Sequence, residues 1–450
     1  MLKKNDIVLL TIESITNEGN GIGHVDGIAV FVPLTATGDV LKARIVKVQK
    51  SYCYGIIDEI IEPSPDRILP DCTCYKRCGG CSLRHITYEA ELREKSSWVR
   101  DAMHRIGGFT LEPLPILPSP SRNRYRNKAQ FPFGQNEDGC FTGFFAPRSH
   151  TVIPCVDCPL QPKEFSEIAA WVCRYANHHG ITIYDEQSGK GLLRHLYLRQ
   201  AAVDESIMLC LIINGSNLPN ANDFTREVQK AFPHISTVLL NHNTQHNNVI
   251  LGKSQTVLSG SGTLQDVLCG VTVSLSPHSF YQVNHDAAEQ LYREAARLAA
   301  LMPGETLLDL YCGAGTIGLS MVSPWQKLIG VEVVSSAVEN ARSNAKRAGV
   351  ADAEFLCADA GQATQILAKR GLQPDVIVLD PPRKGCDSAT LQAVVHMAPS
   401  RIVMVSCNPA TMARDSAILR ENGYLLQCYR PIDLFPRTAH CETVGLFIKQ

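Results

Sequence analysis

The sequence has no long apolar run. No stretch of its 450 residues approaches the roughly 20 apolar residues that a membrane-spanning helix needs. The short basic start of the chain is followed only by the run IVLLTI at 7–12, and charged residues come next. Such a run is too short for the apolar region of a secretory signal peptide. We therefore expect a cytoplasmic protein that has no membrane partner.

The sequence also lacks an excess of charge of either sign. Its net charge is −1, and charged residues make up 19% of the chain. This balance excludes a uniformly basic nucleic-acid-binding protein, but not one that concentrates positive charge on part of its surface. No internal repeat and no low-complexity tract is visible, which excludes a solenoid and a largely disordered chain.

Cysteine, by contrast, is abundant. The count of 17 is odd, so a fully disulfide-paired framework is impossible. Because the sequence shows no signal for secretion, metal binding, catalysis and burial are the better explanations for these cysteines.

The length predicts two to four domains, at roughly 100–200 residues each. Residues 1–62 alternate short strand-like segments with glycine turns, which is typical of a small β-barrel. Strand-like segments dominate residues 122–272, and we interpret them as an α+β domain. From about residue 286, apolar runs alternate with helical segments, as in a doubly wound α/β domain. The end of the chain predicts a closing antiparallel hairpin.

A glycine-rich turn separates a predicted strand from a predicted helix in LLDLYCGAGTIGLS, residues 307–320. Its G-x-G-x-x-G spacing alone is weak and also fits a dinucleotide-binding fold. Acidic residues end successive strands, which suits a nucleoside with a neutral or cationic attachment better than a pyrophosphate. The Asp-Pro-Pro turn at 380–382 is typical of methyltransferases that act on flat nitrogenous substrates. The acidic residues in question are Asp309, Glu332, Asp359 and Asp380.

Cys407 ends the fifth predicted strand of this domain, on the side where ligands bind in open α/β sheets. A thiolate there is placed to add to carbon 6 of uracil, which would make carbon 5 able to attack a methyl group. A base must then remove the proton from carbon 5. Glu442, at the start of the last strand, is the candidate base. Burial in the core is the alternative for any single cysteine, and Cys441 is a competing nucleophile.

The motifs DLYCGAG, DPPRKG, VSCNPAT and HCETV, in this order and spacing, resemble the RNA uracil-5-methyltransferase family over essentially the whole chain. The resemblance implies that Cys407 is the nucleophile and Glu442 the base. It also implies that S-adenosylmethionine contacts Gln282, Tyr311, Glu332 and Asp380, a set to which we add Asp359 and Thr316. At Thr316 some members of the family carry an asparagine that touches the cofactor.

The 23S rRNA branch of this family has an N-terminal TRAM barrel and an iron–sulfur cluster. The resemblance therefore implies a multidomain fold that ends in a Rossmann-like methyltransferase domain. Its TRAM barrel would span 1–62, and its central RNA-binding domain, with the cluster, 65–90 and 122–272. The methyltransferase domain would comprise 91–121 and 273–450.

Four cysteines crowd into CTCYKRCGGC, residues 72–81, a spacing that suits thiolate ligands of a metal rather than disulfides. From spacing alone, the fourth ligand is either Cys74 or a cysteine of CVDC at 155–158. The resemblance favours a 4Fe–4S cluster, with zinc and no metal as the alternatives. The ligand set that it favours is Cys72, Cys78, Cys81 and Cys158.

Two basic segments are the candidate RNA contacts. In SRNRYRNK, four basic side chains alternate, so on a strand they would form one positive stripe with Tyr125 among them. RHLYLR adds Arg194 and Arg199. Such patches fit phosphate contact and base stacking, although a solvated strand face gives the same pattern. The four side chains of the expected stripe are Arg122, Arg124, Arg126 and Lys128.

The sequence thus predicts an enzyme that forms 5-methyluridine in structured RNA, with 23S rRNA as the first candidate and a monomer as the default state. A tRNA substrate stays open, because relatives with barrel and cluster also act on tRNA. A non-catalytic iron–sulfur RNA-binding protein is a second hypothesis, and a dinucleotide oxidoreductase is a third. Intact Cys407 and Glu442 disfavour the second, and the Asp-Pro-Pro turn disfavours the third.

Overall fold

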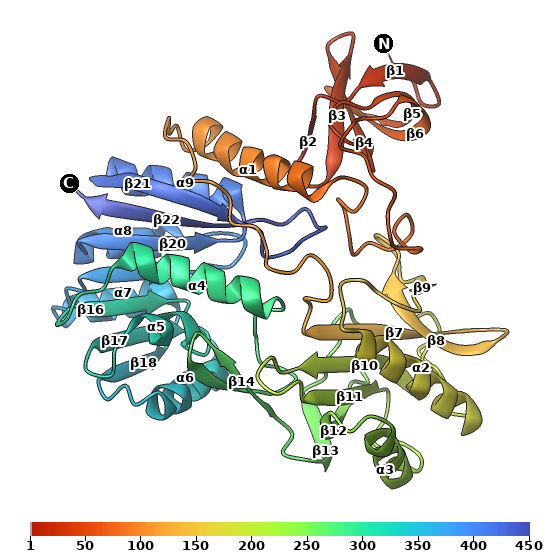
Figure 1. Cartoon of the computed structure of the whole chain (residues 1–450). Coiled ribbons are helices and arrows are strands. Elements are labelled where there is room, and N and C mark those ends of the chain that lie inside the picture. The colour runs from red at the N-terminus through yellow and green to blue at the C-terminus, as the bar shows by residue number, and fades with distance from the viewer. Residues whose placement is uncertain (1) are drawn as a thin grey trace.

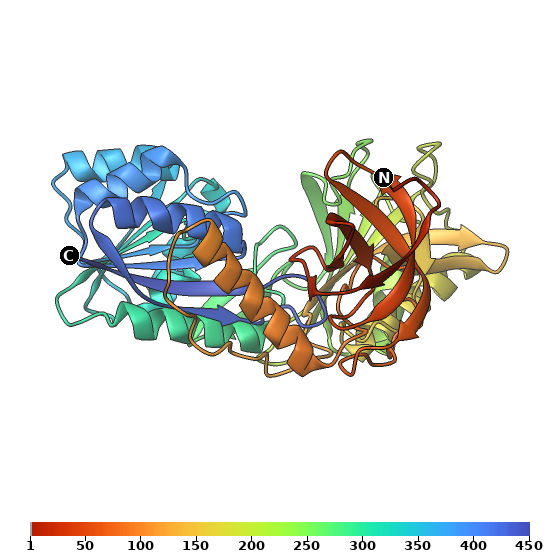
Figure 2. The same cartoon turned by 90° about the horizontal axis from the view of Figure 1, so that it is seen from above.

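The computed structural model describes residues 2–450 and divides them among three main sheets with flanking helices (Figure 1). The first sheet has the strand order β1-β5-β6-β4-β3-β2 and curls into a barrel (Figure 2). Alternate residues point inward, and in β5 these are Leu41, Ala43 and Ile45, all fully buried. This confirms the predicted N-terminal barrel. Its strands are β1 (Ile7–Thr11), β2 (Ser14–Ile15), β3 (Asn20–Val25), β4 (Ile28–Pro33), β5 (Val40–Val48) and β6 (Tyr52–Glu62).

The middle of the chain forms a seven-stranded sheet of order β13-β12-β11-β10-β7-β8-β9. Two helices, α2 (Lys163–His178) and α3 (Ala221–Ala231), pack their apolar sides on a core that includes Phe131, Leu209 and Val238. The α+β architecture expected here is therefore present. Its strands are β7 (Lys128–Asn136), β8 (Gly139–Phe145), β9 (Val152–Pro154), β10 (Leu193–Gln200), β11 (Ile207–Ile213), β12 (Ile235–His242) and β13 (Ser254–Ser259).

The last sheet has the order β18-β17-β16-β19-β20-β22-β21, with five parallel strands and a closing antiparallel hairpin. The central parallel strands are buried apolar runs, because helices cover both faces (Figure 2). This confirms the α/β domain and its final hairpin. The strands are β16 (Thr306–Leu310), β17 (Lys327–Glu332), β18 (Ala353–Cys357), β19 (Val376–Leu379), β20 (Arg401–Ser406), β21 (Tyr424–Ile432) and β22 (Glu442–Lys449).

Helices connect these parallel strands and complete the layers. The short helix α5 follows the glycine turn, and α9 follows Cys407. No helix within residues 2–450 is long and apolar enough to cross a membrane. The helices of this part of the chain are α4 (His285–Ala299), α5 (Thr316–Met321), α6 (Ser335–Arg347), α7 (Ala360–Lys369), α8 (Ser388–Met397) and α9 (Pro409–Glu421).

Two segments join the α/β unit to the rest of the chain. Helix α1 (Tyr88–Arg105) packs against α9 and β21, which come much later in the sequence (Figure 2), and its Trp98 also packs on Ile15 of the barrel. The hairpin of β14 (Leu264–Leu268) and β15 (Val271–Leu275) shares one core with α4 and with residues of the central sheet such as Tyr197. The predicted boundary between 272 and 273 falls inside β15. The division at 1–62, 65–90 with 122–272, and 91–121 with 273–450 stays a prediction.

The expected positive stripe at 122–128 is wrong. Only Lys128 lies in a strand, where β7 begins, and Arg124 has a positive φ of 58° that breaks the alternation. Arg124 forms two hydrogen bonds with the Asp157 carboxylate, at 2.6 and 2.7 Å, whereas Arg122 lies over the ring of Tyr88. Tyr125 is buried and cannot stack on a base.

The second basic segment is also not an exposed patch. Arg194 and Arg199 lie in β10 and are 3% and 1% exposed. Arg194 donates hydrogen bonds to backbone carbonyls in the loop after β12, and Arg199 donates to those of Ser276 and Ser279. These guanidinium groups satisfy buried carbonyls that would otherwise lack a donor, so they act in folding rather than in phosphate contact.

Candidate active site

Four of the predicted site residues lie at one edge of the α/β sheet. Strands β16, β17, β19 and β20 run parallel and in register, so their carboxyl ends lie side by side. Asp309 and Glu332 lie at the ends of β16 and β17, and Asp380 and Cys407 directly follow β19 and β20. This is the edge at which open α/β sheets bind their ligands.

The glycine turn is built around two of these carboxylates. Glu332 accepts hydrogen bonds from the backbone N–H of Gly313 at 3.1 Å and of Val334 at 2.8 Å. Asp309 accepts from the N–H of Gly318 at 2.9 Å. A Cβ at position 318 would lie 2.7 Å from the carboxylate oxygen of Asp309 and 2.9 Å from the side chain of Leu328, so only glycine allows this approach. The turn is therefore fixed by the same acidic groups that line the site.

Burial is the main influence on the carboxyl groups at this edge. Burial, with smaller contributions from Asp380 and Glu332 and against the hydrogen bond from Gly318, raises the pKa of Asp309 to about 8. Burial also raises the pKa of Asp380 to about 7. Within residues 2–450, one oxygen of Asp309, Oδ1, is buried and has no hydrogen-bond partner. A ligand that brings positive charge or donors suits this set of groups, and the sulfonium and ammonium of S-adenosylmethionine supply both.

The other predicted cofactor residues lie in the loops and helix ends of this domain and in the segment before α4. Asp359 caps α7 by accepting from the N–H of Gly361 at 3.0 Å. Thr316 begins α5, with its hydroxyl 3.4 Å from that of Tyr292. Tyr311 has a positive φ of 66°, which turns the chain into the glycine loop. Gln282 lies in the segment before α4, and its backbone carbonyl accepts from the Asn127 side chain at 3.0 Å.

Cys407 and Glu442 are brought together by strand pairing. Strand β22 pairs antiparallel with β20, and its last pair joins Ser406 to Thr443. Cys407 follows the last residue of β20, and Glu442 is the first residue of β22, so one step beyond this pair brings the two residues across from each other. Cys407 is partly exposed and Glu442 is buried. A thiol and a carboxyl from residues 35 positions apart in sequence thus share the edge that holds Asp380 (442 − 407 = 35).

The protonation of this pair is set by burial and by neighbouring charges. Burial, together with Glu442 and Asp380 and against the opposing charge of Arg383, raises the pKa of Cys407 to about 11. Burial raises the pKa of Glu442 to about 8, with the same contributions from Asp380 and Arg383. Arg383 is therefore the cation of this site. Sequence reasoning missed it, although it stands directly after the Asp-Pro-Pro turn.

Hydrogen bonds join the loop of Cys407 to the Asp-Pro-Pro loop. Asn408 caps α9 by accepting from the N–H of Ala410 at 3.1 Å, and its amide donates to the carbonyl of Arg383 at 3.1 Å. The Thr411 hydroxyl lies 3.4 Å from the same carbonyl. These contacts hold Cys407 close to Asp380. Cys441, the competing nucleophile, is 3% exposed within the apolar core and its thiol points to the carbonyl of Ile432.

A second candidate site is a cavity of about 70 Å³ between the segment 72–81 and the end of β9. A single zinc ion needs all its sulfur ligands about 2.3 Å from one point. Within residues 2–450, no group of three or more His, Cys, Asp or Glu side chains is arranged to hold such an ion. A 4Fe–4S cluster is larger and binds each thiolate through a different iron atom, so it suits sulfurs spread around a cavity. The cysteines that line it are Cys72, Cys74, Cys78, Cys81, Cys155 and Cys158.

Comparisons with known proteins identify the domains of the chain. Residues 2–57 match the TRAM domain, and residues 270–450 match the tRNA (Uracil-5-)-methyltransferase family. An uncharacterised RNA methyltransferase of Halalkalibacterium halodurans is 40% identical over 448 residues, which cover 99% of this chain and 97% of that protein. One from Bacillus cereus is 39% identical over 445 residues, with the same coverage of each chain.

A solved structure extends the likeness to the whole fold. The crystal structure of Pyrococcus abyssi tRNA (uracil-54, C5)-methyltransferase in complex with S-adenosyl-L-homocysteine superposes with a TM-score of 0.77. The match has 25% sequence identity and covers 98% of this chain and 100% of that one. Together with the relatives, it supports a class I fold that uses S-adenosylmethionine. The chain belongs to the RNA uracil-5-methyltransferase family and carries an N-terminal TRAM domain.

Proposed function

We propose that this protein forms 5-methyluridine in 23S rRNA, with Cys407 as nucleophile and Glu442 as base. The observation that carries the proposal is the position of Cys407 and Glu442 across from each other, beside the carboxylate-lined glycine turn. A ribosomal RNA substrate also implies the cytoplasmic location expected from the sequence, and we propose a monomer as the active form.

Cys407 and Glu442 would act in different steps of the reaction. The Cys407 sulfur forms a bond to carbon 6 of uracil, and the electron pair moves to make carbon 5 nucleophilic. Bound S-adenosylmethionine supplies the methyl group that carbon 5 takes. Glu442 then removes the proton from carbon 5, the double bond between carbons 5 and 6 re-forms, and the Cys407 thiolate leaves. Arg383 lies where it favours the charged forms of both residues.

The cofactor would lie against the glycine turn. We propose that Glu332 and Asp359 contact its nucleoside part and that Asp380 lies near the methyl group. The orphaned oxygen of Asp309 and the acidic strand ends support this placement. The full set that we propose for S-adenosylmethionine is Gln282, Tyr311, Thr316, Glu332, Asp359 and Asp380.

We further propose that Cys72, Cys78, Cys81 and Cys158 hold a 4Fe–4S cluster. The six cysteines around one cavity support this proposal, and Cys74 and Cys155 would be spare. Since the ligands come from segments more than 70 residues apart (158 − 81 = 77), the cluster would tie these segments together. Its role would be structural.

Replacing Cys81 with serine is expected to remove the cluster. The wild-type protein, purified without oxygen, should contain about four iron atoms and as many sulfides per chain, and the variant few. Cys357→Ser, which changes an exposed cysteine elsewhere, is the matched control and should keep its iron. About one zinc per chain, or no metal in the wild type, would contradict the cluster.

The RNA substrate is tested directly in cells. In a strain that lacks the protein, 5-methyluridine should disappear from defined positions of 23S rRNA and return when the gene is restored. The likeness to a tRNA methyltransferase favours tRNA as the second candidate substrate. Loss of the modification from tRNA alone would replace the rRNA proposal with that one. An unchanged level in both RNAs would favour a non-catalytic RNA-binding protein.

A further inference from the structure

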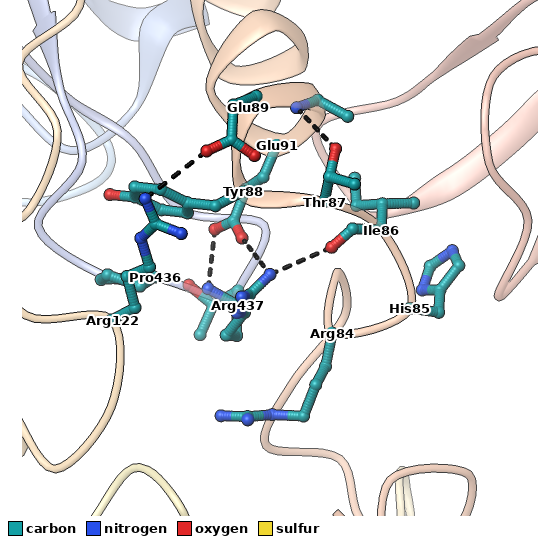
Figure 3. A network of polar contacts seen from close by, with 12 residues as sticks. Arg84, His85, Ile86, Thr87, Tyr88, Glu89, Glu91, Arg122, Pro436 and Arg437 are labelled. Carbon is teal, nitrogen blue, oxygen red and sulfur yellow. Dashed lines mark hydrogen bonds and ion pairs between the residues drawn. The ribbon is translucent and has the colours of Figure 1, made fainter. Parts of the chain in front are cut away.

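The base candidate, Glu442, is the first residue of β22, next to the loop that joins β21 to β22. Buried polar contacts hold this loop. Glu442 pairs with Ile432, so residues 433–441 form the loop between β21 and β22. Residues 433–441 are not part of a helix or strand, so side-chain and backbone contacts with other segments must hold the loop in place. Several segments distant in sequence form hydrogen bonds with the loop, among them Leu117, Tyr125 and Asn284. The contacts of its two charged anchors come from α1 and from the segment after Cys81 (Figure 3).

The first anchor is a buried lysine. Lys95 is fully buried in α1, and its ammonium donates to Asp433 at 2.6 Å, to Glu91 at 2.7 Å and to the carbonyl of Phe435 at 3.1 Å. The hydroxyl of Tyr88 donates to the other oxygen of Asp433 at 2.8 Å. A buried charge with this many partners is costly to displace, so the first part of the loop is held on α1.

The second anchor is Arg437, where the chain turns toward Glu442. Its N–H donates to Glu91 at 2.6 Å, and its guanidinium donates to the carbonyl of Ile86 at 3.0 Å and lies 3.6 Å from Glu91 (Figure 3). Its own carbonyl accepts from the N–H groups of Ser82 at 2.9 Å and Leu83 at 3.1 Å. The backbone N–H, the backbone carbonyl and the guanidinium Nη1 of Arg437 are therefore each engaged.

The backbone of Arg437 shows that these contacts determine its conformation. Its φ is 69°, in the left-handed region that side chains other than glycine rarely adopt. Such a conformation persists only where the surroundings over-determine it. Glu442 follows five residues later (442 − 437 = 5), so the loop transmits the position of Arg437 to the start of β22.

We propose that Arg437 is a positioning residue for Glu442, and that it holds the carboxylate where it can reach the proton on carbon 5. The inference rests on the proposed function. It implies that two steps of the reaction depend on different parts of the structure. Addition of Cys407 and methyl transfer depend on β20 and the glycine turn, whereas proton removal depends on the loop 433–441. Loosening the loop should therefore slow elimination and leave the methylated base bonded to Cys407.

Arg437→Met tests this, because methionine keeps a long apolar stem and the backbone N–H bond to Glu91, but loses the guanidinium's bond to Ile86 and its ion pair with Glu91. We expect kcat to fall about ten- to a hundredfold, as a misplaced catalytic group gives. On ordinary uridine RNA with S-adenosylmethionine, a denaturation-stable protein–RNA complex that contains the transferred methyl group should accumulate. The rate of methyl transfer in a single turnover should stay within about twofold of the wild type.

The matched control is Arg93→Met on the same helix. Arg93 is exposed, pairs with Asp66 and does not contact the loop, so no complex should accumulate. Glu91→Gln, which weakens both anchors, should give the same complex as Arg437→Met. If Arg437→Met slows methyl transfer and elimination equally, or changes neither, the positioning role is wrong. If the wild type forms no adduct even on 5-fluorouridine RNA, the proposed function has failed instead.

Discussion

Replacing Cys407 with alanine is expected to lower the rate of methyl transfer by roughly 10⁴- to 10⁶-fold, the range seen when an enzyme loses its nucleophile. Without the sulfur, no bond to carbon 6 forms and carbon 5 stays a poor nucleophile. Folding should be little affected, because Cys407 is partly exposed and its neighbour Asn408 keeps the cap of α9.

RNA that contains 5-fluorouridine gives the direct measurement. Fluorine at carbon 5 cannot be removed as a proton, so the reaction stops after methyl transfer with the base bonded to the nucleophile. The wild type should form a stable adduct, and Cys407→Ala should form none. Cys441→Ala is the matched control, since that thiol is buried in the apolar core and points to the backbone carbonyls of Ile432 and Glu442, and it should still form the adduct. An adduct that survives Cys407→Ala would refute the assignment.

The electrostatics of the free protein keep the Cys407 thiol protonated. Its pKa of about 11 means that burial and the carboxyl groups of Glu442 and Asp380 outweigh the opposing charge of Arg383. A cation bound among Asp309, Glu332 and Asp380 would offset those negative charges and lower the pKa of the thiol. The free protein should accordingly react slowly with thiol reagents at neutral pH. The sequence does not reveal these opposing effects on the pKa of Cys407, because Arg383 and Cys407 are distant along the chain.

Patterns that repeat along a single strand or helix made the fold predictable. The buried runs of β16, β19 and β20 and the alternation in β5 identified the α/β domain and the barrel. The same rule failed at Arg124, because a positive φ and the Asp157 carboxylate override the alternation. It also failed at Arg199, since charge in a sequence does not reveal that a buried carbonyl needs a donor.

The site was predictable to the extent that strand order determines it. Asp309, Glu332 and Asp380 end parallel strands, and any such fold places them at one edge. The pairing of Ser406 with Thr443 depends on β22 inserting between β20 and β21, which the sequence does not specify. The contact between Lys95 and Asp433 spans 338 positions and carries no local signal. Long-range contacts of this kind appear only in three dimensions.

Replacing Glu442 with glutamine should stop the reaction one step later than replacing Cys407. Glutamine has nearly the same shape but cannot take a proton, so the methylated base should stay bonded to Cys407. Loss of a general base lowers turnover by about 10²- to 10⁴-fold. The complex should form on ordinary uridine RNA and resist denaturation. A variant that turns over at the wild-type rate, or that fails to transfer the methyl group at all, would exclude Glu442 as the base.

The same residue predicts the pH dependence of the wild-type enzyme. Burial raises the pKa of Glu442 to about 8, so only about a tenth of it is ionised at pH 7. Because the base acts in its ionised form, the rate of elimination should rise about tenfold per pH unit below pH 7 and level off above about pH 8. Elimination can be followed as decay of the methylated complex in a single turnover. Arg383→Met should shift this rise to higher pH, since Arg383 favours the ionised form of the Glu442 carboxylate. If the rate of the wild-type enzyme instead rises near pH 4, the carboxylate is not buried in the working enzyme.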